Sequence, residues 1–577
     1  MRTGKSSGAR SWGADVTATE EVTAGAVTGA GRLRPVRRRG TRDPGNRRVV
    51  AILTVIPLVF IGVFFVWPVG ALVVRAVGVS DGEGVLGLAR RTDAWGLLGF
   101  TLAQAAASTV LTLLVAAPII WLVATCSART STVLMVGVTV PFVLPTVVVG
   151  MTFRALVSSG GPLSGLGLDG SVASILAAHA FLNVAVMVRV VGSAWRTQDP
   201  RAEQAARTLG ATPWRAFTTV VLPRLVVPIL SASALVFLFC STSFGVVLIL
   251  GNGRWQTIET AVYTQAIGYF DLPAAVTLSL LQVVVVIVVV AISGLVTPRT
   301  VAVVAREASA RARGRVSRAM AALVVGWAVV VLAGPLSVVV VRSLRPTAGG
   351  EWTLSGYRSL NRAVNGETPV QTLQYSVVSA LWAMVLSVVI GLLAAIALQR
   401  ARGVAATVGS VLALVPLGVS AVTVGFGYLI VLASLPAGVA SWPGLIPAVQ
   451  GLIAVPVVIR VIAPALAAIP PRLRHAAATL GACPWRVWRT VDLPLIWRPL
   501  AASGAFAFII AVGEFGATGF LARPGTTTLP VLIGSALNRP GADNLATAMA
   551  CSVLMIAATV VAVVVMESFR TTSGGDL

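Results

Sequence analysis

Long uncharged apolar segments dominate this sequence and constrain its fold more than any other feature. The segment from Pro273 to Val296 is typical, because it holds no charged side chain and its residues 283–290 are all β-branched. A membrane-spanning helix needs about 20 mostly apolar residues. In lipid a helix is favoured even for β-branched residues, since it satisfies its own backbone hydrogen bonds.

About twelve segments reach this length, so the sequence predicts an all-α polytopic membrane protein. Only 11% of the residues are charged and 56% are hydrophobic, which excludes an ordinary soluble enzyme and a disordered chain. The predicted spans lie near 49–74, 97–124, 132–155, 171–193, 225–250, 273–296, 318–343, 372–398, 405–434, 444–469, 497–521 and 543–566.

The basic residues orient these spans. A net charge of +24 on a soluble chain would suggest nucleic acid. Here most Lys and Arg fall in alternate loops and in the N-terminal region, as expected for cytoplasmic segments of a protein in the cell (plasma) membrane. We therefore expect both termini in the cytoplasm, lipid as a partner and no nucleic acid. Residues 1–48 are predicted to be a disordered basic cytoplasmic tail, 299–317 a cytoplasmic linker and 571–577 a C-terminal tail.

The chain repeats itself with an offset of 271 residues. The segments Glu203–Pro228 and Arg474–Pro499 match at 14 of 26 positions without a gap. Two tandem halves of six helices in the same orientation follow, at 49–298 and 318–570. The repeated element itself is too polar to span a membrane. It is predicted to be a helix, a turn at Gly-Ala-Thr/Cys-Pro-Trp and a second helix ending at Leu-Pro, because Gly suits a helix C-cap and Pro the first turn of the next helix.

Side chains for a cofactor or for catalysis are scarce. The four cysteines, Cys126, Cys240, Cys483 and Cys551, are far apart and are predicted to be small buried apolar residues, and the two histidines lie in different segments, so no metal site is expected. The single lysine, Lys5, is too close to the start for a Gly-x4-Gly-Lys phosphate loop. If ATP is used, another chain must bind it, so we expect no cofactor here and no enzyme activity of this chain.

The repeated element resembles the coupling loop of ABC importer permeases, whose pattern is Glu-Ala-Ala, three residues, Gly, nine residues, Ile, one residue and Leu-Pro. Both copies match at Ala-Ala, Gly and Leu-Pro, and the family's Glu falls on Gln204 and His475, so an ion pair made by that Glu is not carried over. The resemblance covers about residues 49–570. It implies coupling to an ATPase through Gln204, Ala205, Ala206, Gly210, Pro213, Trp214, Arg215, Leu222 and Pro223, and through His475, Ala476, Ala477, Gly481, Pro484, Trp485, Arg486, Leu493 and Pro494.

The fused two-half arrangement is similar to that of bacterial ferric-iron and thiamine importer permeases. Thr242-Ser-Phe-Gly and Glu514-Phe-Gly carry this likeness, together with Thr257-Ile-Glu-Thr-Ala-Val-Tyr. The resemblance implies that an external binding protein delivers a small solute, ferric iron or thiamine. It also implies that two ATPase subunits bind the coupling helices and move the halves between inward- and outward-open states.

Glu514 is a carboxylate inside a predicted span. Such a group is costly in lipid, by about 2.5–3.5 kcal/mol on insertion scales, unless it faces protein or water. We expect Glu514 to line the translocation path, where it would favour a cation, with Ser243 at the equivalent place in the first half. The alternative is a structural carboxylate bonded to a neighbouring helix.

Two other classes of protein compete with the importer. An ion-coupled secondary transporter can also have two parallel six-helix repeats, but it leaves the duplicated loop unexplained. A membrane enzyme is the second alternative, but the sequence contains no HExxH motif and no pair of intramembrane carboxylates.

Overall fold

A computed structural model of the chain describes residues 54–77, 84–296, 318–346, 350–363, 366–400, 420–537, 539 and 541–571. These residues belong to one compact unit, Val50–Leu577, and every regular element that they form is a helix, as predicted. The predicted tail at 1–48, the linker at 299–317 and the last six residues lie outside the described ranges.

Ten helices of the described residues are long and apolar enough to span a membrane. The first runs from Thr54 to Arg75 and includes η1 (Gly62–Val66) and the start of α2 (Trp67–Val77). The others, some extended by short helical segments, contain α4 (Ala94–Thr125), α7 (Val172–Met187), α11 (Leu222–Ser241), α14 (Leu272–Val296), α15 (Arg318–Leu344), α17 (Pro369–Arg400), α21 (Leu445–Ala467), α24 (Leu493–Gly513) and α27 (Ala542–Thr571).

The predicted third span, 132–155, is not one straight helix. It consists of α5 (Ala128–Val143) and α6 (Thr146–Val157), which meet at an angle of 95°. Leu144 is extended there, with φ −63° and ψ 140°, because the ring of Pro145 disfavours the helical conformation of the residue before it. The predicted span 405–434 lies partly outside the described residues, and its described part contains α19 (Ala421–Ala433).

The first spanning helix of each half packs against the other half. Tyr428 Oη on α19 donates to the carbonyl of Phe64 at 2.6 Å. From the first spanning helix of the second half, Trp327 Nε1 on α15 donates to the carbonyl of Val115 on α4 at 3.2 Å. The two halves therefore hold each other by an exchange of their first helices.

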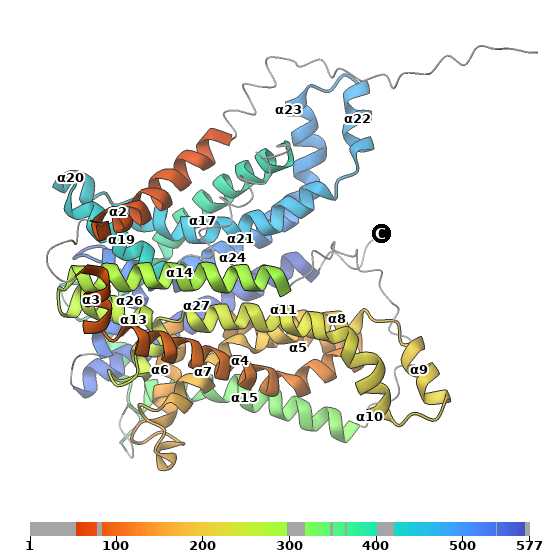
Figure 1. Ribbon diagram of the computed structural model, residues 1–577, viewed down its shortest axis with the longest axis horizontal. Helices are drawn as coiled ribbons and strands as arrows, with labels where there is room; N and C mark the ends of the chain where they lie inside the picture. Colours follow the sequence, from red (N-terminus) through yellow and green to blue (C-terminus); the bar gives the residue numbers. More distant parts are fainter. Residues whose placement is uncertain are drawn as a thin grey trace, which may run out of the picture. The chain divides into compact units, whose positions relative to one another are not determined.

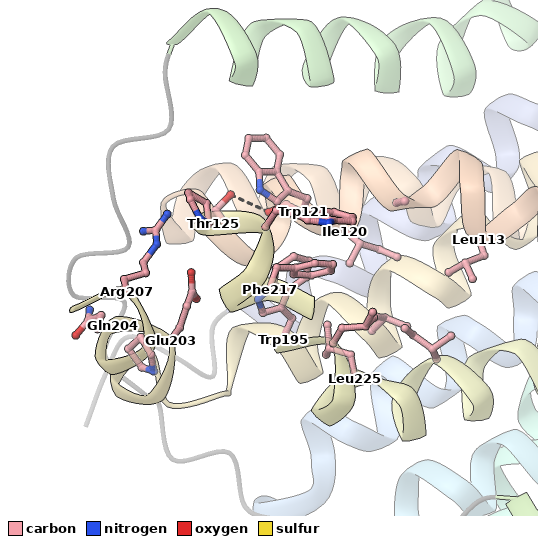
Figure 2. A pocket seen from close by; sticks show the side chains of 17 residues that line it. Leu113, Ile120, Trp121, Thr125, Trp195, Glu203, Gln204, Arg207, Phe217 and Leu225 are labelled. Carbon is pink, nitrogen blue, oxygen red and sulfur yellow. Dashed lines mark hydrogen bonds between the residues drawn. The ribbon is translucent and has the colours of Figure 1, made fainter. Parts of the chain in front are cut away.

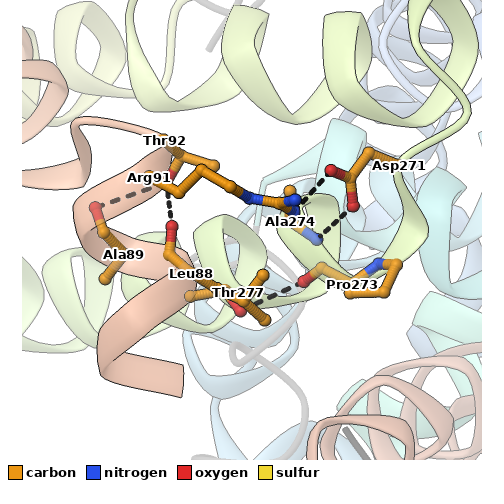
Figure 3. Close-up of polar contacts among 8 residues, drawn as sticks. All are labelled: Leu88, Ala89, Arg91, Thr92, Asp271, Pro273, Ala274 and Thr277. Carbon is orange, nitrogen blue, oxygen red and sulfur yellow. Dashed lines mark hydrogen bonds and ion pairs between the residues drawn. The ribbon is translucent and has the colours of Figure 1, made fainter. Parts of the chain in front are cut away.

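Short helices lie at the end of the spans opposite to the two repeated loops (Figure 1). One of them, α3 (Gly84–Arg91), is tied to the start of α14 by an ion pair of 2.6 Å between Arg91 Nη2 and Asp271 Oδ2 (Figure 3). Asp271 Oδ1 also accepts from the backbone N–H of Ala274 at 3.0 Å. Other short elements, at either end of the spans or within them, are η2 (Ser164–Leu166), η3 (Val188–Gly192), α8 (Ser193–Arg196), α12 (Gly245–Leu250), α13 (Ile258–Tyr263), η5 (Thr264–Gly268), α16 (Ser355–Arg358), η6 (Ser359–Asn361), α20 (Ala437–Ala440), α25 (Thr518–Leu521) and α26 (Leu529–Leu537).

Candidate functional site

The two repeated loops form the same helix-turn-helix at the same end of the molecule (Figure 1). In the first copy, α9 (Arg201–Thr208) is followed by a turn and by α10 (Pro213–Ala216). In the second, α22 (Pro471–Thr479) is followed by a turn and by α23 (Pro484–Val487). The prolines begin the second helix in both copies, as predicted, because a missing N–H is harmless in the first turn.

Gly210 and Gly481 end the first helix of each loop. Their φ angles are +87° and +80°, a left-handed conformation that glycine adopts without a Cβ penalty. The next N–H in each turn closes the helix, with Ala211 donating to Ala206 at 3.0 Å and Ala482 to Ala477 at 3.1 Å. This is the Schellman pattern of a helix C-cap, so glycine is needed here for its conformation.

Large apolar side chains stand exposed at matching positions of the two loops. Leu209 and Leu480 are 89% and 88% exposed, and Trp214 and Trp485 are 73% and 69% exposed. Exposed aromatic residues flanked by arginine are typical of protein interfaces, and Arg215 and Arg486 follow the two tryptophans. Gln204, His475, Ala205, Ala476, Pro213 and Pro484 are exposed as well.

Cys483 differs from the prediction for the cysteines. Its thiol is exposed at the N-cap position of α23, whereas Cys240 and Cys551 are buried and Cys126 is half-buried. The equivalent residue, Thr212, caps α10 with a hydrogen bond from the N–H of Arg215 at 3.3 Å. Cys483 is therefore exposed because it occupies the N-cap position of this surface loop, although its side chain makes no capping hydrogen bond there.

The second helix of each loop does not end at Leu-Pro, as the sequence suggested. The helix continues through a π-helical turn, η4 (Phe217–Val221) or η7 (Trp488–Asp492), into α11 or α24. The N–H of Leu222 donates to Phe217 and that of Leu493 to Trp488, five residues back. The wider π turn accommodates Pro223 and Pro494, which lack an N–H to donate. Each loop is thus joined rigidly to a spanning helix.

Breaks in four helices meet where the two halves contact each other, and we call this place the central region. The end of α24 at Gly513 packs against Pro145, where α5 and α6 meet, and a Cβ on Gly513 would lie 3.3 Å from the proline ring. A Cβ on Gly245 would overlap Thr146, and one on Gly516 would lie 3.0 Å from Ala421. Glycine is needed at these places because the helix starts of α6 and α19 approach the neighbouring backbone closely.

Ser243 and Glu514 both lie in this central region and are 6% exposed. Ser243 Oγ is 2.8 Å from Nε2 of His179, whose Nδ1 is 3.1 Å from Ser108 Oγ. The carboxylate of Glu514 accepts the backbone N–H groups of Ala517 at 2.7 Å and Thr518 at 2.9 Å. Glu514 therefore holds the break between α24 and α25, and it stabilises the start of α25 as a carboxylate does at a helix N-terminus.

Two phenylalanines at equivalent positions meet where the halves face each other. Phe244 and Phe515 stack with ring centroids 5.1 Å apart and an angle of 19° between the planes. Tyr263 packs against Phe244 at 5.2 Å and against Phe520 at 5.4 Å. These aromatic rings join the two halves across the break region.

A second buried carboxylate, Glu259, was missed by the sequence reasoning. It lies on α13, is 1% exposed, and accepts from Gln282 Nε2 at 2.9 Å and from the hydroxyl of Ser420. Ser420 is the N-cap of α19, so this bond joins the two halves. Glu259 falls in a loop between two predicted spans, so hydropathy gave no signal of its burial.

The chain matches the family described as binding-protein-dependent transport system inner membrane component twice, over residues 116–306 and 387–571. The chain belongs to this family. The permease is therefore a multi-pass protein of the ABC importer class, with the fused two-half organisation that the duplicated loop predicted. This family assignment argues against the two alternatives, a secondary transporter and a membrane enzyme.

Thiamine permeases are similar to this permease over most of its length. It is 26% identical to the thiamine transport system permease protein ThiP of Brucella abortus strain 2308, over 86% of this chain and 91% of the relative. It is 28% identical to that of Escherichia coli K12, over 64% and 68% of the two chains. The sulfate transport system permease protein CysT of Escherichia coli K12 is 36% identical over 23% of this permease and 52% of the relative.

Proposed function

We propose that this permease imports thiamine, which an external binding protein delivers and separate ATPase subunits drive through the membrane. The observation that carries the proposal is the extent of likeness to a thiamine permease, 86% of this chain against 23% for the sulfate permease. The resemblance at the sequence level left ferric iron and thiamine open. The long matches favour thiamine.

Two copies of one ATPase-binding loop support two ATPase contacts. Gly210 and Gly481 set the same turn, and Trp214 and Trp485 stand out to similar extents. Since η4 and η7 continue each loop into a spanning helix, a movement of α9 or α22 would be transmitted to α11 or α24. Positive charge near these loops supports a cytoplasmic location for them and for both termini.

Glu514 and Ser243 are proposed to face the path that opens when the halves separate. The stacked pair Phe244 and Phe515 would close this path in the arrangement described. Thiamine carries a permanent positive charge, so a buried carboxylate beside the aromatic pair suits it through both charge and cation–π attraction. For substrate to reach the Glu514 carboxylate, the N–H groups of Ala517 and Thr518 would have to release it.

Uptake of labelled thiamine tests the substrate. The permease, its cognate ATPase and its binding protein are produced in cells lacking thiamine uptake, and unlabelled thiamine, sulfate and ferric iron are offered as competitors. Thiamine alone is expected to compete. Absence of labelled thiamine uptake, or inhibition of that uptake by sulfate or ferric iron as strong as by unlabelled thiamine, refutes the proposal.

Two variants separate the path from the scaffold. Glu514→Gln is expected to lower uptake per folded molecule at least about tenfold, because it removes the charge that a cation meets. Glu351→Gln, at an exposed position, is the matched control and should transport normally. Full uptake by Glu514→Gln contradicts a role in the path. If Glu514→Gln lowers the amount of folded protein but not the uptake per folded molecule, the carboxylate has the structural role.

The exposed thiol of Cys483 offers a direct test of the ATPase contact. A thiol-reactive crosslinker on purified membranes is expected to join the permease to a protein with a Gly-x4-Gly-Lys loop. Cys483→Ser is the control that should remove the product. A product that persists in Cys483→Ser, or one that lacks such a protein, argues against this contact.

A further inference from the structure

A cavity of about 870 Å³ lies beside the first coupling loop (Figure 2). Its deep part is apolar and is formed by the spanning helices α4 and α11. These helices are joined at another level by a hydrogen bond of 2.8 Å from Gln104 Nε2 to the carbonyl of Cys240. The apolar lining includes Leu113, Ala117, Ile120, Leu225 and Ile229. The walls are membrane-spanning helices, so the natural neighbour of this apolar part is a lipid chain.

Aromatic rings surround the middle of the cavity. Trp121, Trp195, Trp214 and Phe217 all line it. Phe217 lies between two of them, with ring centroids 5.3 Å from Trp195 and 5.7 Å from Trp214. Tryptophan is enriched at the level of lipid headgroups, where its ring is half in apolar and half in polar surroundings.

One acidic and one basic side chain stand at the polar end. Glu203 and Arg207 are one turn apart on α9, and both line the cavity. Figure 2 shows them reaching from α9 on the side of Thr125, which ends α4. Neither side chain forms an ion pair with any residue that the structure describes. A negative and a positive group of a ligand could therefore both find a partner here.

The second loop lacks this pair of charges. At the positions 271 residues later, Arg474 replaces Glu203 and Ala478 replaces Arg207. Arg474 instead forms an ion pair of 2.7 Å with Asp492, where the first copy has Val221. Gln204, Pro213 and Trp214 of the first coupling loop also line the cavity, but these two charges are not part of the pattern that both loops share, so they need an explanation of their own.

We propose that this cavity binds one phospholipid with a zwitterionic headgroup of the phosphoethanolamine type. Arg207 donates to the phosphate, in a charge-assisted hydrogen bond. The ammonium group lies at Glu203 and against the tryptophan faces, which attract cations. An acyl chain fills the apolar part between α4 and α11, where each buried CH2 contributes about 0.8 kcal/mol. A lipid held in this way would link α9 to α4 and so stiffen the first coupling loop alone.

Native mass spectrometry of the full chain tests the proposal. The protein is reconstituted in vesicles of equal parts phosphatidylethanolamine and phosphatidylglycerol, extracted in mild detergent and weighed with its bound lipid. The wild type is expected to retain one phosphatidylethanolamine. Arg207→Ala should lower the retained phospholipid about tenfold, as the loss of a charged hydrogen bond predicts. Glu203→Gln should keep a phospholipid but lose the preference for phosphatidylethanolamine.

Two further variants guard against misfolding and against loose surface lipid. Arg201→Ala removes the same charge from α9 at an exposed position outside the cavity lining, and it should retain the lipid. Ala117→Phe fills the apolar part and leaves both charges in place, so it should expel the lipid from a folded protein. Equal retention by wild type, Arg207→Ala and Ala117→Phe overturns the proposal. The proposal is also overturned if the wild type carries no lipid, or if the molecule that Ala117→Phe displaces is not a phospholipid.

Discussion

Valine in place of Gly210 or Gly481 is expected to weaken ATPase binding without unfolding the permease. An ideal Cβ would meet no atom within 4 Å at either glycine, so the substitution causes no clash. The cost comes from the backbone, since φ is +87° and +80°. A residue with a Cβ adopts the left-handed conformation at a cost of about 1–2 kcal/mol. Valine therefore moves the turn out of the geometry that presents α9 and α10 together.

The affinity for the ATPase subunit should fall accordingly. A free-energy cost of about 1–2 kcal/mol per loop corresponds to a loss of about 5–30-fold in affinity, since about 1.4 kcal/mol is tenfold. The measurement is a binding titration of the labelled cognate ATPase against the permease in lipid nanodiscs. The double variant Gly210→Val with Gly481→Val should lose co-purification altogether.

Two controls make this test specific. Asparagine is tolerated in the left-handed region, so Gly210→Asn should bind far better than Gly210→Val. Gly326→Val, on α15 where a Cβ also meets nothing within 4 Å, should bind normally. The reasoning is refuted if Gly210→Val binds like the wild type, or if Gly210→Asn is as weak as Gly210→Val.

Three further outcomes follow from contacts between the two halves. Replacing both Phe244 and Phe515 by alanine removes the stacked pair and should let thiamine leak through proteoliposomes without ATP, whereas tight vesicles would show that the barrier lies elsewhere. Glu259→Ala leaves the buried Gln282 and Ser420 without their shared acceptor, so the free energy of unfolding should fall by about 1–3 kcal/mol. A thermal midpoint equal to that of the wild type contradicts this. Arg189 and Glu567 form an ion pair of 2.9 Å between the halves. Because the pair is partly exposed, a double-mutant cycle in unfolding should give a coupling free energy of about 1 kcal/mol or less. A coupling free energy above about 3 kcal/mol would contradict the screening of this pair by solvent.

The repeated loop could be predicted closely because its determinants are local. Gly210 and Gly481 end a helix through their own backbone conformation, and Pro213 and Pro484 begin the next one through theirs. The error concerned the Leu-Pro end. Proline normally interrupts the hydrogen bonds of a helix, and only the π turn before it shows how the helix continues.

The central region could not be predicted in the same way. Phe244 and Phe515 are 271 residues apart. A hydropathy pattern predicts the half to which each residue belongs, but it does not predict that the two rings touch. Glu514 was noticed because it interrupts an apolar run, whereas Glu259 lies in a polar-looking loop that the fold buries. Glu514 is bound by backbone N–H groups at the break after α24. Glu259 is bound by Gln282 on α14 and by Ser420 of the opposite half.

The sequence by itself determined the membrane-spanning class, the two halves and the duplicated loop. Hydropathy and short-range backbone chemistry act over one to a few helical turns, so they can be seen along the chain. The tertiary structure decided that the first helix of each half packs on the other, that α5 and α6 bend apart, and that aromatic rings and carboxylates meet at the centre. These features depend on surfaces brought together from distant segments, where close packing and the need to satisfy buried polar groups select the partners.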